Sequence, residues 1–374
     1  MSVHLRDLGW DDLWSAQAAE LTNAPDHSTG PQLAPRLAPL DAHSPDPQLA
    51  PRLAPLDAHS PARVVRTDRG RCLVHTADGL THATLGTGLD PAPTTGDWVL
   101  VNSTATVSAV LPRRTCVVRG AGRRDSRGQV LAANVDVLFV VAALSEGPNL
   151  NRLERLLAMA WESGARPAIL LTKADLSTDV DTERAEVEQI APGVEVIAVS
   201  VLTGQGLDDL RAALPHGTTG ALVGPSGTGK SSLVNALLGT DLLLTSDTRA
   251  DGKGRHISTT RELVPLPWGA VLLDTPGLRG VQLWDAADGV EQTFSDVEAI
   301  AARCRFSDCA HDSEPGCAIR ATLADGTLTA RRLASWTKLR REQAWLAGRY
   351  DARQRAEQRR VWKIRSKEAR QRGN

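Results

Sequence analysis

A complete phosphate-binding pattern stands in the second half of the chain. The pattern G-x-x-x-x-G-K-S is filled by Gly224-Pro225-Ser226-Gly227-Thr228-Gly229-Lys230-Ser231, with Ser232 as the next helical residue. Its glycines let backbone amides turn toward phosphate oxygens, Lys230 brings a positive charge to the β- and γ-phosphates, and the Ser231 hydroxyl can ligate Mg²⁺. An apolar run at 221–223 precedes it and a helical pattern at 232–238 follows, as this motif requires. The pattern therefore predicts a nucleoside triphosphate bound with Mg²⁺, and Lys230 as a catalytic residue.

A second motif, Asp274-Thr275-Pro276-Gly277, follows about 40 residues later, after the apolar run 271–273. We expect Asp274 to hold Mg²⁺ through a water and the Gly277 amide to sense the γ-phosphate. Between the two motifs, residues 254–260 are polar and flanked by glycine, as expected of a switch loop. Thr259 is the first choice for a second hydroxyl ligand of Mg²⁺, with Ser258 and Thr260 as alternatives. His256 is the polar group available to orient an attacking water.

A third motif, Thr172-Lys173-Ala174-Asp175, ends a strand-like run at 168–171. An aspartate at this position accepts from the N1 and N2 donors of guanine, which adenine lacks, while the lysine stem covers the ring face. The segment that begins at Ser200, residues 200–207, follows the next strand-like run and is expected to offer a backbone N–H to the guanine O6. Together the two segments predict a guanine nucleotide.

The order of these motifs is unusual. The base-reading motif comes about 50 residues before the phosphate-binding pattern, whereas Ras-like GTPases have the reverse order. After Gly277 only about 30 residues remain before Cys304, too few for a second copy of the base reader. The sequence therefore predicts a circularly permuted GTPase domain.

Three cysteines and a histidine cluster near the C-terminus, at Cys304, Cys309, His311 and Cys317. Three thiolates and one imidazole form a closed tetrahedral set that is typical of structural zinc. The alternative is a set of buried thiols beside a surface histidine. Pro315-Gly316 lets the chain bend around a metal, and the sequence predicts one structural Zn²⁺.

The elements that must position these residues form a multidomain α/β protein. Strand-like runs at 135–142, 168–171, 194–199 and 221–223 alternate with helical patterns at 150–163 and 207–214, which predicts a doubly wound parallel sheet. Upstream, short β-prone runs at 71–75, 97–102 and 105–111 alternate with turns and predict a small OB-like barrel. We expect domains at 63–119, 120–290 and 291–374, after an extension at 1–62.

The two ends of the chain differ in composition. A near-tandem proline-rich repeat occupies 31–45 and 47–61, and proline at this density predicts an extended or disordered linker. The segment 331–374 contains fifteen Lys or Arg and four acidic residues. Its helical pattern over 333–367 includes Trp336, Trp345 and Trp362, which can either pack on a neighbouring element or stack on RNA bases.

Composition limits the classes of protein. The 374 residues are 41% hydrophobic and 23% charged, and their net charge is −1. A chain of this length and hydrophobic content can bury sizeable cores. The apolar runs are too short to span a bilayer, and residues 1–10 lack the order of a secretory signal. We expect a cytoplasmic, monomeric protein with no membrane partner, in which Cys72 and Cys116 are ordinary thiols.

Taken together, these residues resemble the ribosome small subunit-dependent GTPase A (RsgA) family. The resemblance covers residues 63–374 and rests on Gly96-Asp97, Ala133-Asn134-Val135-Asp136, GPSGTGKSS, GRH, DTPG and the Cys-Cys-His-Cys cluster with Glu314-Pro315-Gly316. It implies an N-terminal OB-fold, a permuted GTPase and a C-terminal zinc domain. It also implies GTP hydrolysis to GDP in late assembly of the small ribosomal subunit, with ribosomal RNA contacts from both flanking domains.

The sequence departs from that family at two functional positions and from Ras-like enzymes at a third. Thr172 stands where asparagine is usual, so we expect the loss of a side-chain link between the base reader and neighbouring loops. Ile257 replaces a usual threonine, and Leu278 follows Gly277 where Ras-like enzymes have a water-positioning glutamine. Because of Leu278, intrinsic hydrolysis is expected to be slow, and the resemblance implies that the small subunit stimulates it. The alternatives are an RNA-binding switch with negligible turnover and an adenine-specific enzyme. Because the Gly277 switch runs directly into the metal-binding region, we also expect the γ-phosphate state to set that region's position on RNA.

Overall fold

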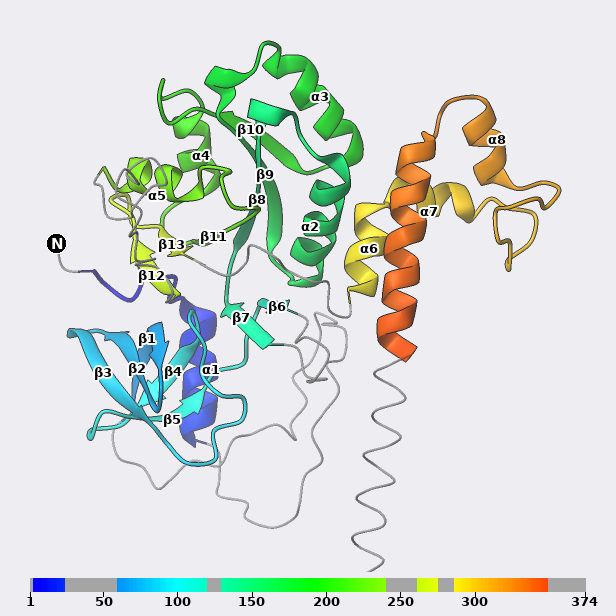
Figure 1. The fold of residues 1–374 in the computed structure, drawn as a ribbon. Coiled ribbons are helices and arrows are strands. Elements are labelled where there is room, and N and C mark those ends of the chain that lie inside the picture. Colours follow the sequence, from blue (N-terminus) through cyan, green and yellow to red (C-terminus); the bar gives the residue numbers. More distant parts are fainter. Residues whose placement is uncertain (1–2, 24–58, 120–128, 240–260, 275–285, 349–374) are drawn as a thin grey trace, which may run out of the picture.

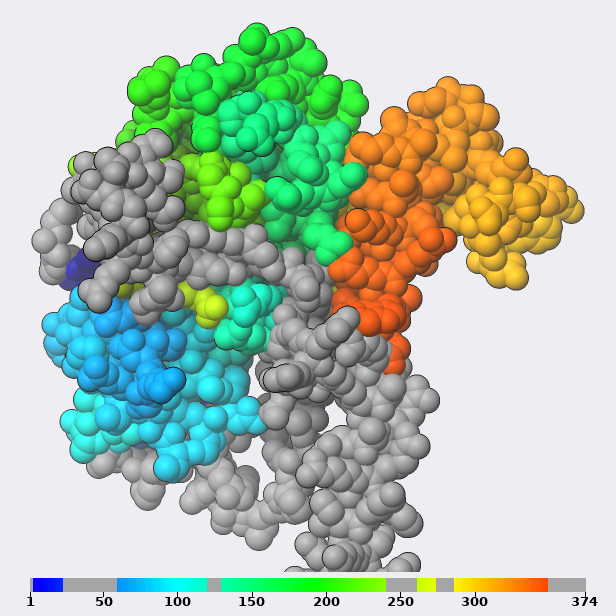
Figure 2. All heavy atoms as spheres, viewed as in Figure 1, coloured from blue at the N-terminus to red at the C-terminus, as the bar shows by residue number. Residues whose placement is uncertain are grey.

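The computed structural model describes residues 3–23, 59–119, 129–239, 261–274 and 286–348. A β-barrel, a helix-covered sheet and a group of C-terminal helices make up the molecule (Figure 1). The C-terminal region, 286–348, stands out from one side of the body in the space-filling view (Figure 2). None of the described helices combines the length and apolar character needed to cross a bilayer.

The barrel consists of strands that close in the order β1-β2-β3-β5-β4. Their bounds are β1 Ser60–Asp68, β2 Arg71–Thr76, β3 Gly79–Leu85, β4 Trp98–Val101 and β5 Thr106–Val110. Val64, Val74 and Val99 are fully buried in its interior. The expected OB-like barrel is confirmed. Ser60 and Pro61, the last two residues of the proline-rich repeat, pair with β4. Residues 31–58 of the repeat lie outside the described residues.

The N-terminal segment, residues 3–23, contains a helix that the sequence analysis does not predict. This helix, α1 (Asp12–Asn23), lies beside the barrel (Figure 1). Leu8 and Trp14 are buried, and the Trp14 ring packs against Trp98 of β4 at a centroid distance of 6.2 Å. The apolar residues of α1 thus contact partners far along the chain, and no local pattern reveals them.

The segments Gly96-Asp97 and Ala133-Asn134 meet where the barrel joins the sheet. Gly96 adopts φ +94°, and a Cβ atom there would lie 2.1 Å from the Ala133 carbonyl oxygen, so only glycine fits. The Asn134 side chain donates to the Gly96 carbonyl at 3.1 Å. The buried Asp97 accepts two hydrogen bonds from the Arg113 guanidinium, at 2.7 and 2.8 Å. These residues therefore fix the joint between barrel and sheet.

A six-stranded sheet in the order β10-β9-β8-β11-β13-β12 forms the centre of the described structure. The chain reaches it through the antiparallel pair β6 (Cys116–Arg119) and β7 (Gln129–Ala133). The strands of the sheet are β8 Val137–Ala143, β9 Arg166–Thr172, β10 Glu195–Val199, β11 Thr219–Val223, β12 Glu262–Pro265 and β13 Val271–Asp274. All the pairings are parallel except that between β12 and β13. The predicted doubly wound sheet is confirmed, with the correction that its edge strand β12 is antiparallel. A tight turn joins β12 to β13, and it is too short for a parallel crossover.

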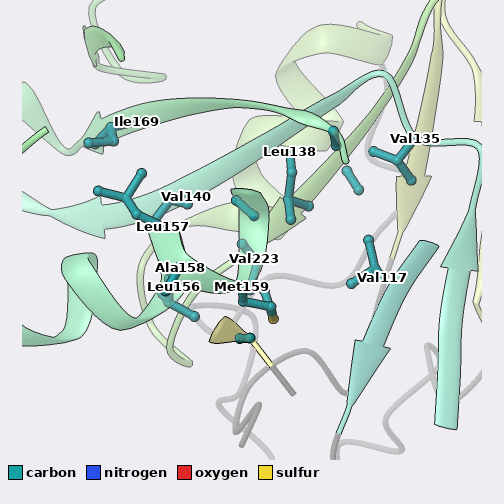
Figure 3. Close-up of a cluster of buried hydrophobic side chains, with 14 of the residues drawn as sticks. Val117, Val135, Leu138, Val140, Leu156, Leu157, Ala158, Met159, Ile169 and Val223 are labelled. Atoms are coloured by element: carbon teal, nitrogen blue, oxygen red, sulfur yellow. The ribbon is translucent and has the colours of Figure 1, made fainter. Parts of the chain in front are cut away.

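Helices cover both faces of the sheet, with bounds α2 Leu150–Glu162, α3 Val180–Ile190, α4 Leu207–Ala213 and α5 Lys230–Leu238. Alternate residues of β8 point to opposite faces, as a strand requires. Leu138 and Val140 join Leu157 of α2 and Val117 of β6 in one core cluster (Figure 3). Phe139 and Val141 join Leu233 of α5 in the other. The predicted helices α2, α4 and α5 are confirmed, while α3 was not predicted.

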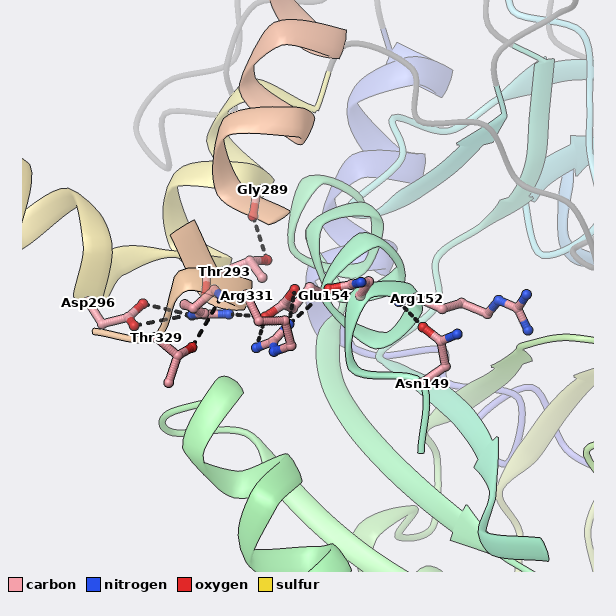
Figure 4. Close-up of polar contacts among 10 residues, drawn as sticks. Asn149, Arg152, Glu154, Gly289, Thr293, Asp296, Thr329 and Arg331 are labelled. Atoms are coloured by element: carbon pink, nitrogen blue, oxygen red, sulfur yellow. Dashed lines mark hydrogen bonds and ion pairs between the residues drawn. The ribbon is translucent and has the colours of Figure 1, made fainter. Parts of the chain in front are cut away.

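The C-terminal region contains α6 (Ala287–Thr293), α7 (Ser295–Ala301), α8 (Ala318–Ala324) and a last helix at 330–348. An ion cluster around the buried Glu154 and Arg332 joins it to α2, with Arg331 and Asp296 partly exposed at its edge (Figure 4). Glu154 of α2 is fully buried and binds the guanidinium groups of Arg331 and Arg332 at 2.8 to 3.0 Å. Arg332 also binds Asp296 of α7 at 2.7 Å. Four side chains from three elements thus fix this region against the sheet.

Candidate nucleotide and metal sites

The phosphate-binding pattern forms the loop between β11 and α5, as predicted. Gly227 and Gly229 have φ values of +82° and +79°, a region that other residues rarely adopt. A Cβ atom on Gly224 would lie 2.5 Å from the carbonyl oxygen of Val141 on the neighbouring strand. The glycines of the motif are therefore required by the path of the chain. The first turn of α5 begins at Lys230, and its amides point toward the loop as anion donors.

Lys230 folds back over the loop. Its ammonium group donates to the carbonyl oxygens of Gly224, at 2.9 Å, and Pro225, and lies 3.2 Å from the Thr228 hydroxyl. The Thr228 hydroxyl in turn donates to the Pro225 carbonyl at 3.0 Å. Ser231 and Ser232 follow at the start of α5 and are half-buried. The loop thus places the lysine charge and the Ser231 hydroxyl at the carboxyl edge of the sheet, where nucleotides bind in such folds.

The base-reading motif lies at the carboxyl end of β9. Lys173 adopts a left-handed conformation with φ +58°, which turns the chain out of the strand. The Ser200 hydroxyl donates to Asp175 Oδ1 at 2.5 Å, and Ser200 itself is fully buried at the end of β10. The carboxylate expected to read guanine is therefore held by a neighbouring loop.

Ser200 contributes differently from the expectation for its segment. Its own N–H donates to the Gln205 carbonyl at 3.0 Å, so that amide is engaged in the loop. Its hydroxyl accepts from the Thr203 N–H at 3.2 Å while donating to Asp175. Gly206 is required here, because a Cβ atom would lie 2.0 Å from the Ala198 carbonyl oxygen. An amide donor to the base must come from another residue of the loop.

The expected loss of a link at Thr172 is wrong. The Thr172 hydroxyl donates to the Thr228 carbonyl of the phosphate loop at 2.7 Å and lies 3.1 Å from the Ala142 carbonyl. A hydroxyl has one proton, so the shorter contact is the hydrogen bond that it makes. The link persists because the Thr228 carbonyl comes close enough to β9 for a short side chain to reach it.

The switch residues fall largely outside the described residues. These comprise His256, Ser258, Thr259, Thr260, Gly277, Leu278 and the side chain of Asp274, and their roles stay predictions. The backbone around them is informative, because Glu262 of β12 pairs directly with Asp274 of β13. The chain leaves one predicted switch segment at β12 and enters the other at the end of β13. The two segments therefore join neighbouring strands, with β13 next to β11 and β12 one strand further out at the edge of the sheet.

The predicted metal ligands come together in space. The Sγ atoms of Cys304, Cys309 and Cys317 and a ring nitrogen of His311 all lie within 4.8 Å of one another. Cys304 Sγ is 4.0 Å from Cys317 Sγ and 3.6 Å from His311 Nδ1. Sulfurs at about 2.3 Å from a tetrahedral metal are about 3.8 Å apart, so the four atoms fit one ion.

The loop that carries these ligands is shaped by local contacts. The Glu314 carboxylate accepts from the backbone N–H groups of Ala310, Asp312 and Ser313 at 2.9 to 3.0 Å. Its own backbone N–H, together with these donors, holds the pKa of Glu314 below the usual range. His311 has φ +65°, a rare conformation that the loop imposes. Burial raises the pKa of the Cys304 thiol, but N–H donors at the start of α8 outweigh it and lower that pKa overall. The thiolate form of Cys304 is thereby favoured, whereas burial and the neighbouring cysteines raise the pKa of the Cys309 thiol to about 11.

The metal cluster also contacts the last helix. The His311 ring lies 5.6 Å from the Trp336 ring, centroid to centroid. Trp336 is buried and donates its indole N–H to Glu298 of α7 at 2.8 Å. Of the two alternatives for the tryptophans, packing is therefore correct for Trp336. Trp345 is 58% exposed, and Trp362 lies outside the described residues.

Comparison with known proteins identifies the family. A family model described as RsgA GTPase matches residues 110–284. A curated relative from Streptomyces avermitilis, named small ribosomal subunit biogenesis GTPase RsgA, is 52% identical over 312 residues, which cover 80% of this chain and 84% of the relative. The chain belongs to the RsgA GTPase family. A relative of the same name from Streptomyces coelicolor is 51% identical over 81% of this chain and 86% of its own length.

Two solved structures share the RsgA-family fold. YjeQ from Thermotoga maritima matches with a TM-score of 0.57 at 22% identity, over 76% of this chain and 99% of that one. YloQ, described as a circularly permuted GTPase, matches with a TM-score of 0.54 at 22% identity, over 76% of this chain and 95% of that one. The permuted order predicted from the motifs is confirmed. Membership of a GTPase family also favours guanine over the adenine alternative.

Proposed function

We propose that this chain hydrolyses GTP to GDP and phosphate and acts in late maturation of the small ribosomal subunit. One observation carries the proposal. The carboxylate of Asp175, held by Ser200, and the complete phosphate loop lie at the same carboxyl edge of the sheet, on β9 and β11. A base reader and a phosphate site at one edge fit a single guanine nucleotide. The names of relatives at 51% and 52% identity support the biological role.

The proposed reaction is in-line attack of water on the γ-phosphate. The Lys230 ammonium and the amides of the phosphate loop stabilise the charge that develops on the phosphate oxygens. Ser231, Asp274 and Thr259 would hold Mg²⁺, which when bound neutralises charge on the β- and γ-phosphates. His256 orients the water. Leu278 cannot do so, and this supports a slow intrinsic rate that the small subunit stimulates.

We further propose that the Cys304, Cys309, His311 and Cys317 cluster holds one structural Zn²⁺. The donor set of three sulfurs and one nitrogen is complete, so no position stays open for a substrate. The barrel at 63–119 and the domain at 291–374 then flank the GTPase domain at 120–290 as ribosomal RNA contacts. The protein acts in the cytoplasm as a monomer.

Stimulated hydrolysis is the first test. GTP turnover is measured with and without purified small subunits, for the full chain and for Lys230→Ala. We expect turnover to rise with small subunits and to fall at least about 100-fold in the variant, because Lys230 stabilises the transition state. Absence of stimulation would favour the alternative of an RNA-binding switch with negligible turnover.

Base selectivity is the second test. Competition of ATP and GTP for the site is measured for the full chain and for Asp175→Asn. The chain is expected to prefer GTP strongly, and the variant is expected to lose most of that preference, because an amide cannot accept from both guanine donors. Equal binding of ATP and GTP by the full chain would refute the base assignment. Cosedimentation with small subunits, in GTP-analogue and GDP states, then tests the proposed cycle.

A further inference from the structure

Two threonine hydroxyls connect the base-reading loop with the phosphate-loop lysine. Thr172 ends β9, three residues before Asp175, and its hydroxyl donates to the Thr228 carbonyl at 2.7 Å. The Thr228 hydroxyl donates to the Pro225 carbonyl at 3.0 Å and lies 3.2 Å from the Lys230 ammonium. Thr172 is 4% and Thr228 6% exposed, so water does not compete freely for these groups.

The directions of these bonds are set by the protons available. Each threonine hydroxyl has one proton and two lone pairs. The Thr172 proton goes to the Thr228 carbonyl and the Thr228 proton to the Pro225 carbonyl. The Thr228 lone pairs then face Lys230, whose ammonium can only donate. Thr172 and Lys230 therefore both donate to Thr228, the first to its backbone carbonyl and the second to its hydroxyl, and Thr228 joins the end of β9 to the lysine.

The same strand end is fixed from the other side by the base reader. The Asp175 carboxylate accepts a hydrogen bond from the Ser200 hydroxyl, which follows β10. A bound guanine would donate further hydrogen bonds to the same carboxylate. We propose that Thr172 and Thr228 are positioning residues that couple guanine capture to the placement of Lys230, so that the base affects the rate of phosphate transfer as well as affinity. This inference rests on the proposed function. It goes beyond it by assigning to the two hydroxyls a role in the reaction.

A purely structural role makes a different prediction. If the hydroxyls only satisfy buried groups, their loss lowers stability and affinity for every nucleotide alike. If they couple the two loops, their loss makes the hydrolysis rate independent of the base. Inosine triphosphate is a suitable probe, because it has the same phosphates as GTP but lacks the N2 amino group that donates a hydrogen bond to Asp175.

The experiment uses the full chain with small subunits and excess protein over nucleotide, so that one turnover is observed. Maximal rates and half-saturating concentrations are measured for GTP and inosine triphosphate. The unchanged chain is expected to hydrolyse GTP about 10-fold faster at saturation than inosine triphosphate, the size of one buried hydrogen bond. In Thr172→Val and in Thr228→Val we expect the two maximal rates to become equal, while the preference for GTP in half-saturation persists through Asp175.

Three controls make the outcome decisive. Thr172→Ser keeps the hydroxyl and is expected to restore the rate difference. The maximal rate of GTP hydrolysis by the double variant Thr172→Val with Thr228→Val is expected to be no lower than that of the slower single variant. The two effects are not additive because both hydroxyls belong to one set of contacts. Thermal unfolding of each variant identifies a general loss of stability. Equal maximal rates in the unchanged chain, or a rate difference that survives in both valine variants, would overturn the inference. Absence of any GTP hydrolysis by the unchanged chain would instead refute the proposed function.

Discussion

The two joints of this molecule are each closed by a buried charge, but the charges differ in sign and in their partners. At the joint of barrel and sheet, Arg63 of β1 is 2% exposed. At the joint of sheet and C-terminal region, Glu154 of α2 is fully buried. Arg63 makes hydrogen bonds to neutral groups, whereas Glu154 binds two arginines. The first joint therefore depends on backbone position and the second on side chains of complementary charge.

The partners of Arg63 come from three segments. Its guanidinium donates to the carbonyls of Leu8 and Asn134, both at 3.0 Å, and to the Thr219 hydroxyl at 3.2 Å. It also lies 4.8 Å above the Trp98 ring. Burial lowers the pKa of Arg63 to about 10, which still leaves it charged at neutral pH. One side chain thus ties the N-terminal segment, the junction and β11 together.

The comparison bears on how nucleotide state reaches the flanking regions. The C-terminal region is fixed to α2 by Glu154, and Arg155 of α2 adds a second ion pair with Glu342. The barrel approaches the start of β12, where Thr95 contacts the Arg261 carbonyl at 3.4 Å and Arg66 lies 3.6 Å from Glu262. β12 directly follows the predicted switch loop in the chain. That the γ-phosphate state sets the position of the metal-binding region stays a prediction, and the barrel contacts the strand that follows the predicted switch loop.

Metal removal is expected to have the largest effect, and only on the C-terminal joint. Structural Zn²⁺ contributes roughly 10–16 kcal/mol to the folding of small metal-dependent regions, so chelation should unfold residues near the cluster. Through His311 and Trp336 the last helix should lose protection as well. Hydrogen exchange with and without chelator measures this. β1 and β4 serve as the internal control, and loss of their protection would contradict the separation of the two joints.

Glu154→Gln is the next largest prediction. The change leaves Arg331 and Arg332 without their shared carboxylate inside the joint, and breaking a buried ion pair from one side costs about 3–5 kcal/mol. Denaturant unfolding of the full chain gives the value. Glu342→Gln is the matched control, because its pair with Arg155 is half-buried and should cost about 1 kcal/mol or less. Equal losses of unfolding free energy in the two variants would contradict the claim that the buried carboxylate of Glu154 contributes more than the half-buried carboxylate of Glu342.

Arg63→Met should destabilise the barrel joint by about 2–3 kcal/mol. The variant leaves the Leu8 and Asn134 carbonyls without their donor, but methionine fills much of the space against Trp98. The expected loss of unfolding free energy is smaller than for Glu154→Gln, because the hydrogen-bond partners of Arg63 are neutral groups. Protection of the N-terminal segment in hydrogen exchange should fall with it. Arg69→Met, at an exposed position of the same barrel, is the control and should change little.

Asp11→Asn is the smallest expected effect, about 1 kcal/mol or less, because its bidentate pair with Arg114 is partly exposed. The Arg114 guanidinium lowers the pKa of Asp11 despite some desolvation. A carboxyl whose folded pKa is depressed adds stability above its unfolded value of about 3.9 and loses it as pH falls through the folded pKa. The difference between the two proteins should therefore be present at pH 7, disappear at low pH and shrink in high salt. A difference that grows on acidification would contradict the pairing.

What could be predicted from the sequence depended on local spacing. The phosphate loop, the base reader and the metal ligands are short patterns, and strands such as β8 and β11 are apolar runs that periodicity reveals. The missed features depend on partners distant in sequence. From the sequence we expect Thr172 to lose a side-chain link, because its acceptor, the Thr228 carbonyl, is 56 residues away in the sequence. Arg63 sits in a strand without any local sign that it is buried. α1 and the antiparallel β12 have short, weakly patterned sequences whose place is decided by the sheet.

The N-terminal segment has a consequence for the order of events during synthesis. Asp7 pairs with His216, 209 residues later, at 3.0 Å, and a Cβ atom on Gly9 would lie 2.9 Å from the Gly217 carbonyl oxygen. The contacts of Asp7 and Gly9 can therefore form only after residues 216 and 217 have been translated, whereas Trp14 can meet Trp98 earlier. A chain that stalls before residue 216 therefore lacks the contacts of Asp7 and Gly9 with this turn, while its contacts with Arg63, Trp98 and Arg114 can already form.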